Sequence, residues 1–198
     1  MGRKRTVMSQ RARRSLRALV LIACLFSSLP RGVQGQPLSP ETRLKATYLR
    51  RMLSFVQWPD TAIPEKGGAF QFCIAGDYML GFALAQELRS VTIGDRRVDV
   101  RWTHKEQDLR GCQALFISSL EKTRVAKVLE SVRGANVLTF GETDGFVEAG
   151  GVVQLSYENN AVRFQINLTA ARAAELKIDA RLLALAKRVV TGNEMPGG

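Results

Sequence analysis

The chain offers few residues that could do chemistry, and the one histidine limits them most. His104 lies in a polar stretch, Thr103-His104-Lys105-Glu106, that is typical of a solvated loop. A serine or cysteine nucleophile would need that histidine as its base, and a zinc site needs three or four Cys, His or carboxylate ligands. We therefore expect a binding protein and not an enzyme, without catalytic residues, metal or cofactor.

Two further sets of residues resemble sites only weakly. Glu142, Asp144 and Glu148 could bring carboxylates together, but a solvated acidic loop has the same composition. Gly76-Asp77 stands where α/β folds bind phosphates, between a predicted strand and a predicted helix. No G-x-G-x-x-G or Walker A motif accompanies it, so the sequence indicates a turn there and no more.

Residues 1–35 are typical of an export signal. The segment is basic and has no acidic residue, turns apolar from Ala18 to Leu29, and ends in the small-residue run Val33-Gln34-Gly35. That order predicts secretion and cleavage, and the apolar run is too short to span a bilayer. Two other readings stay open: lipidation at Cys24, and a twin-arginine signal at Arg13-Arg14.

Export would leave Cys73 and Cys112 as the two cysteines of a domain spanning residues 36–198. Disulfides persist in oxidising compartments outside the cytosol, so these residues are candidates for one bridge, with two buried free thiols as the alternative.

The net charge of +11 belongs mostly to the signal. Eight of the 29 Lys and Arg residues lie in residues 1–35, so the remainder holds 21 basic against 18 acidic side chains. That near balance argues against nucleic acid as a partner.

The pattern of the remaining chain predicts an α/β fold. Ser39 should cap a helix that runs toward Trp58-Pro59, Asp77 a helix through Leu88, and Ser118 or Ser119 a helix to about Arg133. Near-continuous apolar runs are expected of strands that are buried on both faces of a sheet. The sequence predicts three strands of this kind and two hairpins. The strands are expected at 69–75, 112–117 and 137–140, and the hairpins at 91–102 and 152–166.

The last third is predicted to end in helices. Asn167 or Thr169 should cap a helix through Glu175, and Lys177-Ile178-Asp179 should separate it from a helix over Ala180–Val190. The sum is a single three-layer domain with a mixed, partly parallel sheet, helices on both faces and two hairpins.

Four segments in this order resemble the YfiR-like family of exported bacterial proteins and span nearly all of residues 36–198. They are Lys45–Leu49 continuing to Phe55–Pro59, Phe72–Asp77, Gly145-Phe146 to Gly150-Gly151, and Arg163–Leu168 running through Leu176–Asp179 to Ala186.

The resemblance implies a compact α/β domain that forms homodimers in the periplasm. It also implies a repressor that binds the outer part of an inner-membrane diguanylate cyclase and so lowers cyclic-di-GMP signalling, with an outer-membrane lipoprotein as a second partner. Cys73 and Cys112 match one bridge of the repressor type. The second cysteine pair of that type, around the Gly-Gly motif, has no counterpart between Phe146 and Gln154, which favours a structural role for the remaining bridge.

Two hypotheses follow. In the first, the protein inhibits a membrane signalling enzyme, with Arg163, Asn167, Lys177 and Asp179 as a candidate ligand or partner surface. In the second, it is a small-ligand-binding accessory of a sensor kinase or an outer-membrane uptake system, with its ligand near Gly76-Asp77.

Overall fold

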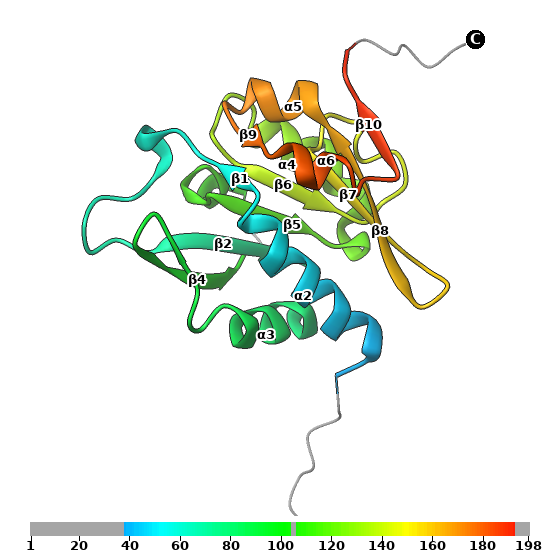
Figure 1. Cartoon of the computed structure of the whole chain (residues 1–198), viewed down its shortest axis with the longest axis horizontal. Coiled ribbons are helices and arrows are strands. Elements are labelled where there is room, and N and C mark those ends of the chain that lie inside the picture. Colours follow the sequence, from blue (N-terminus) through cyan, green and yellow to red (C-terminus); the bar gives the residue numbers. More distant parts are fainter. Residues whose placement is uncertain (1–37, 104–105, 193–198) are drawn as a thin grey trace, which may run out of the picture. The chain divides into compact units, whose positions relative to one another are not determined.

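The computed structural model describes residues 38–103 and 106–192 (Figure 1). The predicted export signal with its Cys24 and twin-arginine alternatives lies outside the described residues, as does His104. Among the helices that are described, none is both long and apolar enough to cross a membrane.

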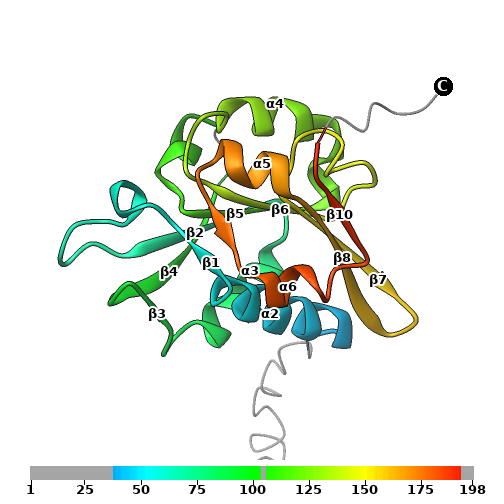
Figure 2. The ribbon, with the colours of Figure 1, turned by 45° about the horizontal axis from the view of Figure 1, so that its top comes forward.

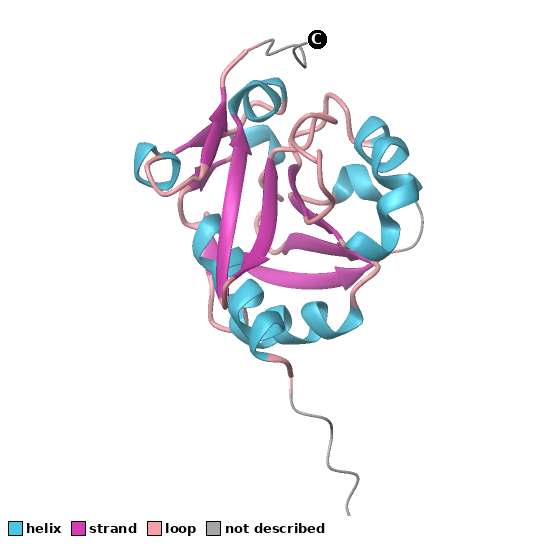
Figure 3. Ribbon diagram, turned by 90° about the vertical axis from the view of Figure 1, so that its right-hand side faces the viewer, coloured by secondary structure: helices cyan, strands magenta, loops and turns pink. Residues whose placement is uncertain are grey.

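An eight-stranded mixed sheet carries helices on both faces, as predicted (Figure 3). The helices are α2 (Pro40–Leu53), α3 (Tyr78–Glu87), α4 (Val125–Ser131), α5 (Leu168–Ala173) and α6 (Ala180–Leu183), with 3-10 turns η2 (Asp60–Ala62), η3 (Glu106–Gly111) and η4 (Ser119–Arg124). The strands are β1 (Val56–Gln57), β2 (Phe70–Ala75), β3 (Thr92–Ile93), β4 (Arg96–Trp102), β5 (Ala114–Ile117), β6 (Leu138–Gly141), β7 (Val153–Glu158), β8 (Ala161–Asn167), β9 (Lys177–Ile178) and β10 (Arg188–Val190).

The strand order is β10-β8-β7-β6-β5-β2-β4-β3, and β1 and β9 form a separate two-stranded ladder. Neighbours are parallel except in the hairpins β3–β4 and β7–β8. From β2 the chain crosses through α3 to β4 on one side, and then returns to β5 on the other side of β2. Strand order therefore reverses between β2 and β5, the kind of position where open α/β sheets bind ligands at the carboxyl ends of their strands.

Alternating side chains of the buried strands feed two cores. Phe72, Ile74 and Phe116 point toward α2 and α3 in the larger core. Cys73 and Leu115, from the same strands, belong to a smaller core with α4. This two-sided burial explains why β2 and β5 are apolar without alternation. Figure 2 shows α4 on one side of the sheet and α2 and α3 on the other.

Three predicted helix starts are confirmed by their caps. The Ser39 hydroxyl accepts a hydrogen bond from the Thr42 amide, the Asp77 carboxylate from Leu80, and the Asn167 side-chain oxygen from Ala170. Each satisfies a backbone N–H that the first turn of a helix leaves without a partner.

Two predicted helices are wrong at their ends. The first helix stops at Leu53, and Val56 instead enters β1, paired with Ile178 of β9. The helix expected over Ala180–Val190 ends at Leu183, because residues 188–190 form β10 beside β8. Val189 and Val190 are β-branched, and an available sheet edge outweighs the helical pattern there.

The loop between β6 and β7 closes around Phe146. This ring is 1% exposed and lies between two glycines: a Cβ on Gly141 would come 2.3 Å from it, and one on Gly151 2.0 Å. Gln154 Oε1 accepts the backbone N–H of Phe146 at 2.9 Å, and Asn167 Nδ2 donates to the Val147 carbonyl at 2.7 Å. Buried contacts of Phe146 and hydrogen bonds from the neighbouring strands therefore fix this loop. It is not solvated along its whole length.

Candidate functional site

The crevice where strand order reverses is filled by side chains of the chain itself. Gly76 has a φ of +93°, and a Cβ there would come 2.9 Å from Glu121 Cγ and 3.1 Å from Ser118 Cβ. Glu142, at the end of β6, accepts hydrogen bonds from the Ser118 hydroxyl at 3.2 Å and the Ser119 N–H at 2.9 Å. The Glu142 carboxylate thus lies where a ligand anion would sit at the amino end of η4.

Lys45 of α2 completes this network. Its Nζ donates to Glu142 at 2.5 Å and to Glu41 at 2.6 Å. Burial would lower the pKa of Lys45, but the hydrogen bonds to Glu142 and Glu41 outweigh it and raise that pKa. Burial would likewise raise the pKa of Glu142, and the bonds from Lys45 and Ser119 lower it. Both groups stay charged at neutral pH, so the network is a structural ion pair and not an acid–base site.

An exposed apolar face lies on α3, beside this crevice. We call it the α3 face and define it by four side chains: Tyr78, 60% exposed; Met79, 49%; Phe82, 52%; and Trp102 at the end of β4, 37%. The opposite side of α3 buries Leu80 and Leu84 in the larger core. A helix that is apolar all round is normally covered all round, so this outer side has the composition of an interface.

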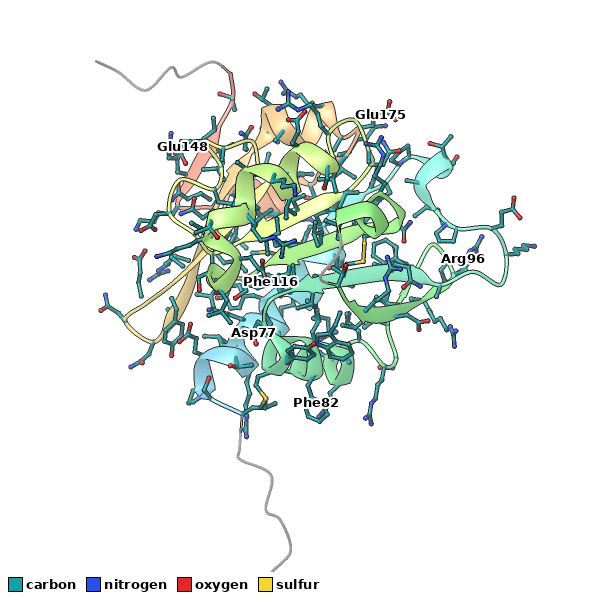
Figure 4. The ribbon with its side chains drawn as sticks, turned by 180° about the vertical axis from the view of Figure 1, so that it is seen from behind. Asp77, Phe82, Arg96, Phe116, Glu148 and Glu175 are labelled. Atoms are coloured by element: carbon teal, nitrogen blue, oxygen red, sulfur yellow. A yellow bond between two sulfur atoms is a disulfide. The ribbon has the colours of Figure 1, made fainter. Side chains whose placement is uncertain are left out.

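The α3 face is a built surface and not a scatter of single residues. Trp102 and Tyr78 stack with ring centroids 6.3 Å apart. The indole lies against Gly81, where a Cβ would come 2.4 Å from Trp102 Nε1. Phe82 is on the side of α3 away from the sheet in Figure 4. Fixed aromatic side chains lose little entropy when a partner covers them, which suits a protein-binding surface.

The four residues predicted as a ligand or partner surface are placed on β8, on β9 and at the N-cap of α6. Arg163 is exposed on β8. Asn167 is four residues along the same strand, roughly 13 Å away by strand rise, and is buried, with both ends of its side chain used within the fold. Lys177 is in β9, opposite Gln57.

Asp179, the fourth, caps α6 and bonds Arg181 at 2.7 Å. Hydrogen bonds from Arg181 lower the pKa of Asp179 to about 2. Asn167 and Asp179 thus have structural roles as helix caps, and a binding surface made by the four residues stays a prediction.

The Cys73–Cys112 disulfide is present and joins β2 to the residues before β5. Its sulfur atoms are buried, and Arg101 Nη2 lies 3.7 Å from Cys73 Sγ and 3.6 Å from Cys112 Sγ. The alternative of two buried free thiols is thereby set aside.

Comparison with known proteins gives the family. A family model described as YfiR/HmsC-like matches residues 42–187. The chain belongs to this family. A solved structure of a conserved domain protein from Vibrio cholerae is similar in fold, with a TM-score of 0.50, 11% identity, and coverage of 75% of this chain and 60% of that one. At that identity the likeness shows the α/β fold alone.

A second solved structure is weaker still. It is an ABC domain in complex with L-Trp from Streptococcus pneumoniae, with a TM-score of 0.46, 9% identity, and coverage of 71% of this chain and 60% of that one. Nothing about this chain follows from it. This chain spans about 60% of the length of both solved structures.

The resemblance noted from the sequence implies a second cysteine pair in the β6–β7 loop, and this chain has no cysteine between Phe146 and Gln154. Phe146 between its two glycines, with Gln154 and Asn167, fixes the same loop without a bridge.

Sequence reasoning missed the α3 face and Lys45. The helix of α3 was predicted, and its unusually apolar outer positions were the available signal. Nothing local links Lys45 to Glu142, because 97 residues separate them.

Proposed function

We propose that this protein is an exported regulator that binds the periplasmic part of a membrane signalling protein of the diguanylate cyclase class and holds it inactive. The α3 face is the observation that carries the proposal. Family membership supports a regulatory role, and a buried disulfide fits an oxidising compartment such as the periplasm.

The α3 face supplies what such an interface needs. Three of its four side chains are aromatic, the class that dominates binding energy in protein interfaces. Stronger binding to the inactive arrangement of the partner than to the active one is sufficient for inhibition, since a ligand shifts an equilibrium by its difference in affinity.

The experiment is co-purification of the protein from solubilised membranes, followed by identification of what is recovered. Phe82→Glu should weaken recovery of the partner by at least about 30-fold, the loss expected of a central aromatic anchor. Leu185→Glu is the matched control, because Leu185 is 70% exposed outside the α3 face and should bind as wild type does.

Two results would count against the proposal in different ways. Undiminished recovery with Phe82→Glu would exclude the α3 face as the interface. Recovery of a sensor kinase or an uptake component, with no cyclase, would exclude the cyclase as partner and favour the accessory role.

A homodimer and an outer-membrane lipoprotein partner belong to the same proposal. Light scattering of the purified protein decides the first, and the same co-purification decides the second.

A further inference from the structure

A cavity of about 490 Å³ opens between α4 and α5. Figure 2 shows α3 on the other side of the sheet. The walls of the cavity are short side chains, with six alanines and two glycines among the lining residues. Side chains this small leave the space between the two helices unfilled. The volume falls within the range of roughly 300–1,000 Å³ typical of small-molecule pockets.

The interior of the cavity is apolar and its rim carries no net charge. Leu129, Val137 and Val152 line it and are buried. At the rim, Arg133 Nη2 lies 2.6 Å from Glu130 Oε2, so the two charges offset each other. A ligand with a net charge would find no counterpart here, and a neutral one suits the site.

One buried hydroxyl in the cavity can donate a hydrogen bond to a ligand. Thr139 lines the cavity and is 3% exposed. Its Oγ1 accepts the Val152 N–H at 2.9 Å, and within the described part of the chain its hydroxyl proton has no acceptor. Asn167, the other buried polar residue at the cavity, donates one Nδ2–H to the Val147 carbonyl and accepts the Ala170 N–H at Oδ1. Thr139 can therefore donate one hydrogen bond to a ligand.

We propose that this cavity is a binding site for a small, neutral, mostly apolar compound that carries one hydrogen-bond acceptor. The apolar body replaces water among the alanines, and the acceptor meets the Thr139 hydroxyl. The inference rests on the cavity alone and does not depend on the proposed regulatory function.

Quinoline and naphthalene form a suitable pair of probes, because they share shape and differ by one ring nitrogen acceptor. NMR titration of the exported, oxidised protein should show both probes shifting the amides of Val137 and Thr139. Quinoline should bind about five-fold more tightly, the gain expected from one neutral hydrogen bond. Thr139→Val should remove that preference, and Thr139→Ser should keep it.

Variants that fill the cavity with a larger side chain test separately where the ligand binds. They keep the proposal falsifiable if Thr139→Val does not fold. Ala126 on α4 and Ala173 on α5 both line the cavity and are exposed, so a larger side chain at either position leaves the core intact. Ala126→Trp and Ala173→Trp should each weaken quinoline binding by at least about tenfold. Arg172→Trp, exposed on α5 outside the lining, should not.

Absence of any shift at Val137 and Thr139 with either probe would overturn the proposal. So would undiminished quinoline binding in both filling variants.

Discussion

The indole of Trp102 lies against the backbone of Gly81, so closely that no other residue fits at position 81 without moving it. This contact holds the end of β4 to α3 and places Trp102 beside Tyr78, with the two rings stacked. The α3 face therefore depends on one glycine inside a helix, where glycine otherwise costs about 0.5–1 kcal/mol relative to alanine.

Gly81→Ala should displace Trp102. Alanine improves the helix, but its Cβ would come 2.4 Å from Trp102 Nε1, so the indole must leave its place on α3. We expect the indole N–H resonance of Trp102 to move toward that of a solvated tryptophan. Trp58 is the internal control, because its indole N–H donates to the Gln113 carbonyl and Trp58 is not among the nearest atoms that a Cβ on Gly81 would meet. An unshifted Trp102 resonance together with a higher melting temperature would contradict the contact.

Gly151→Ala should destabilise the fold by about 1–3 kcal/mol, as overpacking in a full core does. The added Cβ would come 2.0 Å from Phe146 Cε1, and Phe146 is also confined by Gly141 on its other side. Urea denaturation measures the change. Gly111→Ala is the matched control, since a Cβ there meets nothing within 4 Å and Gly111 does not need a positive φ. Equal stability of the two variants would show that the loop yields around Phe146.

Removing the disulfide with Cys73→Ala and Cys112→Ala together should lower the free energy of unfolding by roughly 3–4 kcal/mol, from the entropy of closing a loop of this length. The cysteines are 39 positions apart. Because both are buried, a mild reductant should act slowly on the folded protein and rapidly in urea. A difference below about 1 kcal/mol would mean that residual structure already constrains this segment in the unfolded chain.

The Lys45–Glu142 pair should make stability fall in acid. The folded pKa of Glu142 is below its ordinary value of 4.5, so its contribution is present above that pH and is lost as pH falls through the lowered value. Lys45 has a raised pKa, so its contribution is complete below its ordinary value of 10.5 and is lost only as pH rises beyond it. Neutral pH lies inside this window.

Glu142→Gln should therefore lower the free energy of unfolding by about 2 kcal/mol at pH 7. The loss is smaller than for a fully buried pair because Lys45 retains its ion pair with Glu41. The difference from wild type should shrink as pH falls below 4.5. Chemical denaturation across pH 3 to 8 measures it, and a constant difference over that range would exclude the ion pair as its source.

The fold class followed from local signals, and the site did not. Buried apolar strands and the caps at Ser39, Asp77 and Asn167 depend on residues close together in the sequence. Their elements could therefore be predicted. The exposure of Phe82 depends on which side of α3 meets the sheet, and β10 forms only because β8 offers an edge. Lys45 meets Glu142 because α2 crosses the ends of strands that come much later in the chain.

The placement of the disulfide has a consequence for the order of maturation. Tyr78, Met79, Phe82 and Trp102 all fall between Cys73 and Cys112, so the bridge closes a ring of chain that contains the whole α3 face. In a reduced precursor this segment is held only by sheet pairing and packing. Once the thiols are oxidised, the bridge holds the two ends of this segment together and restricts its local unfolding. Under the proposed export, the α3 face would be locked only after the protein has left the reducing cytoplasm, on the side of the membrane where the proposed partner would be met.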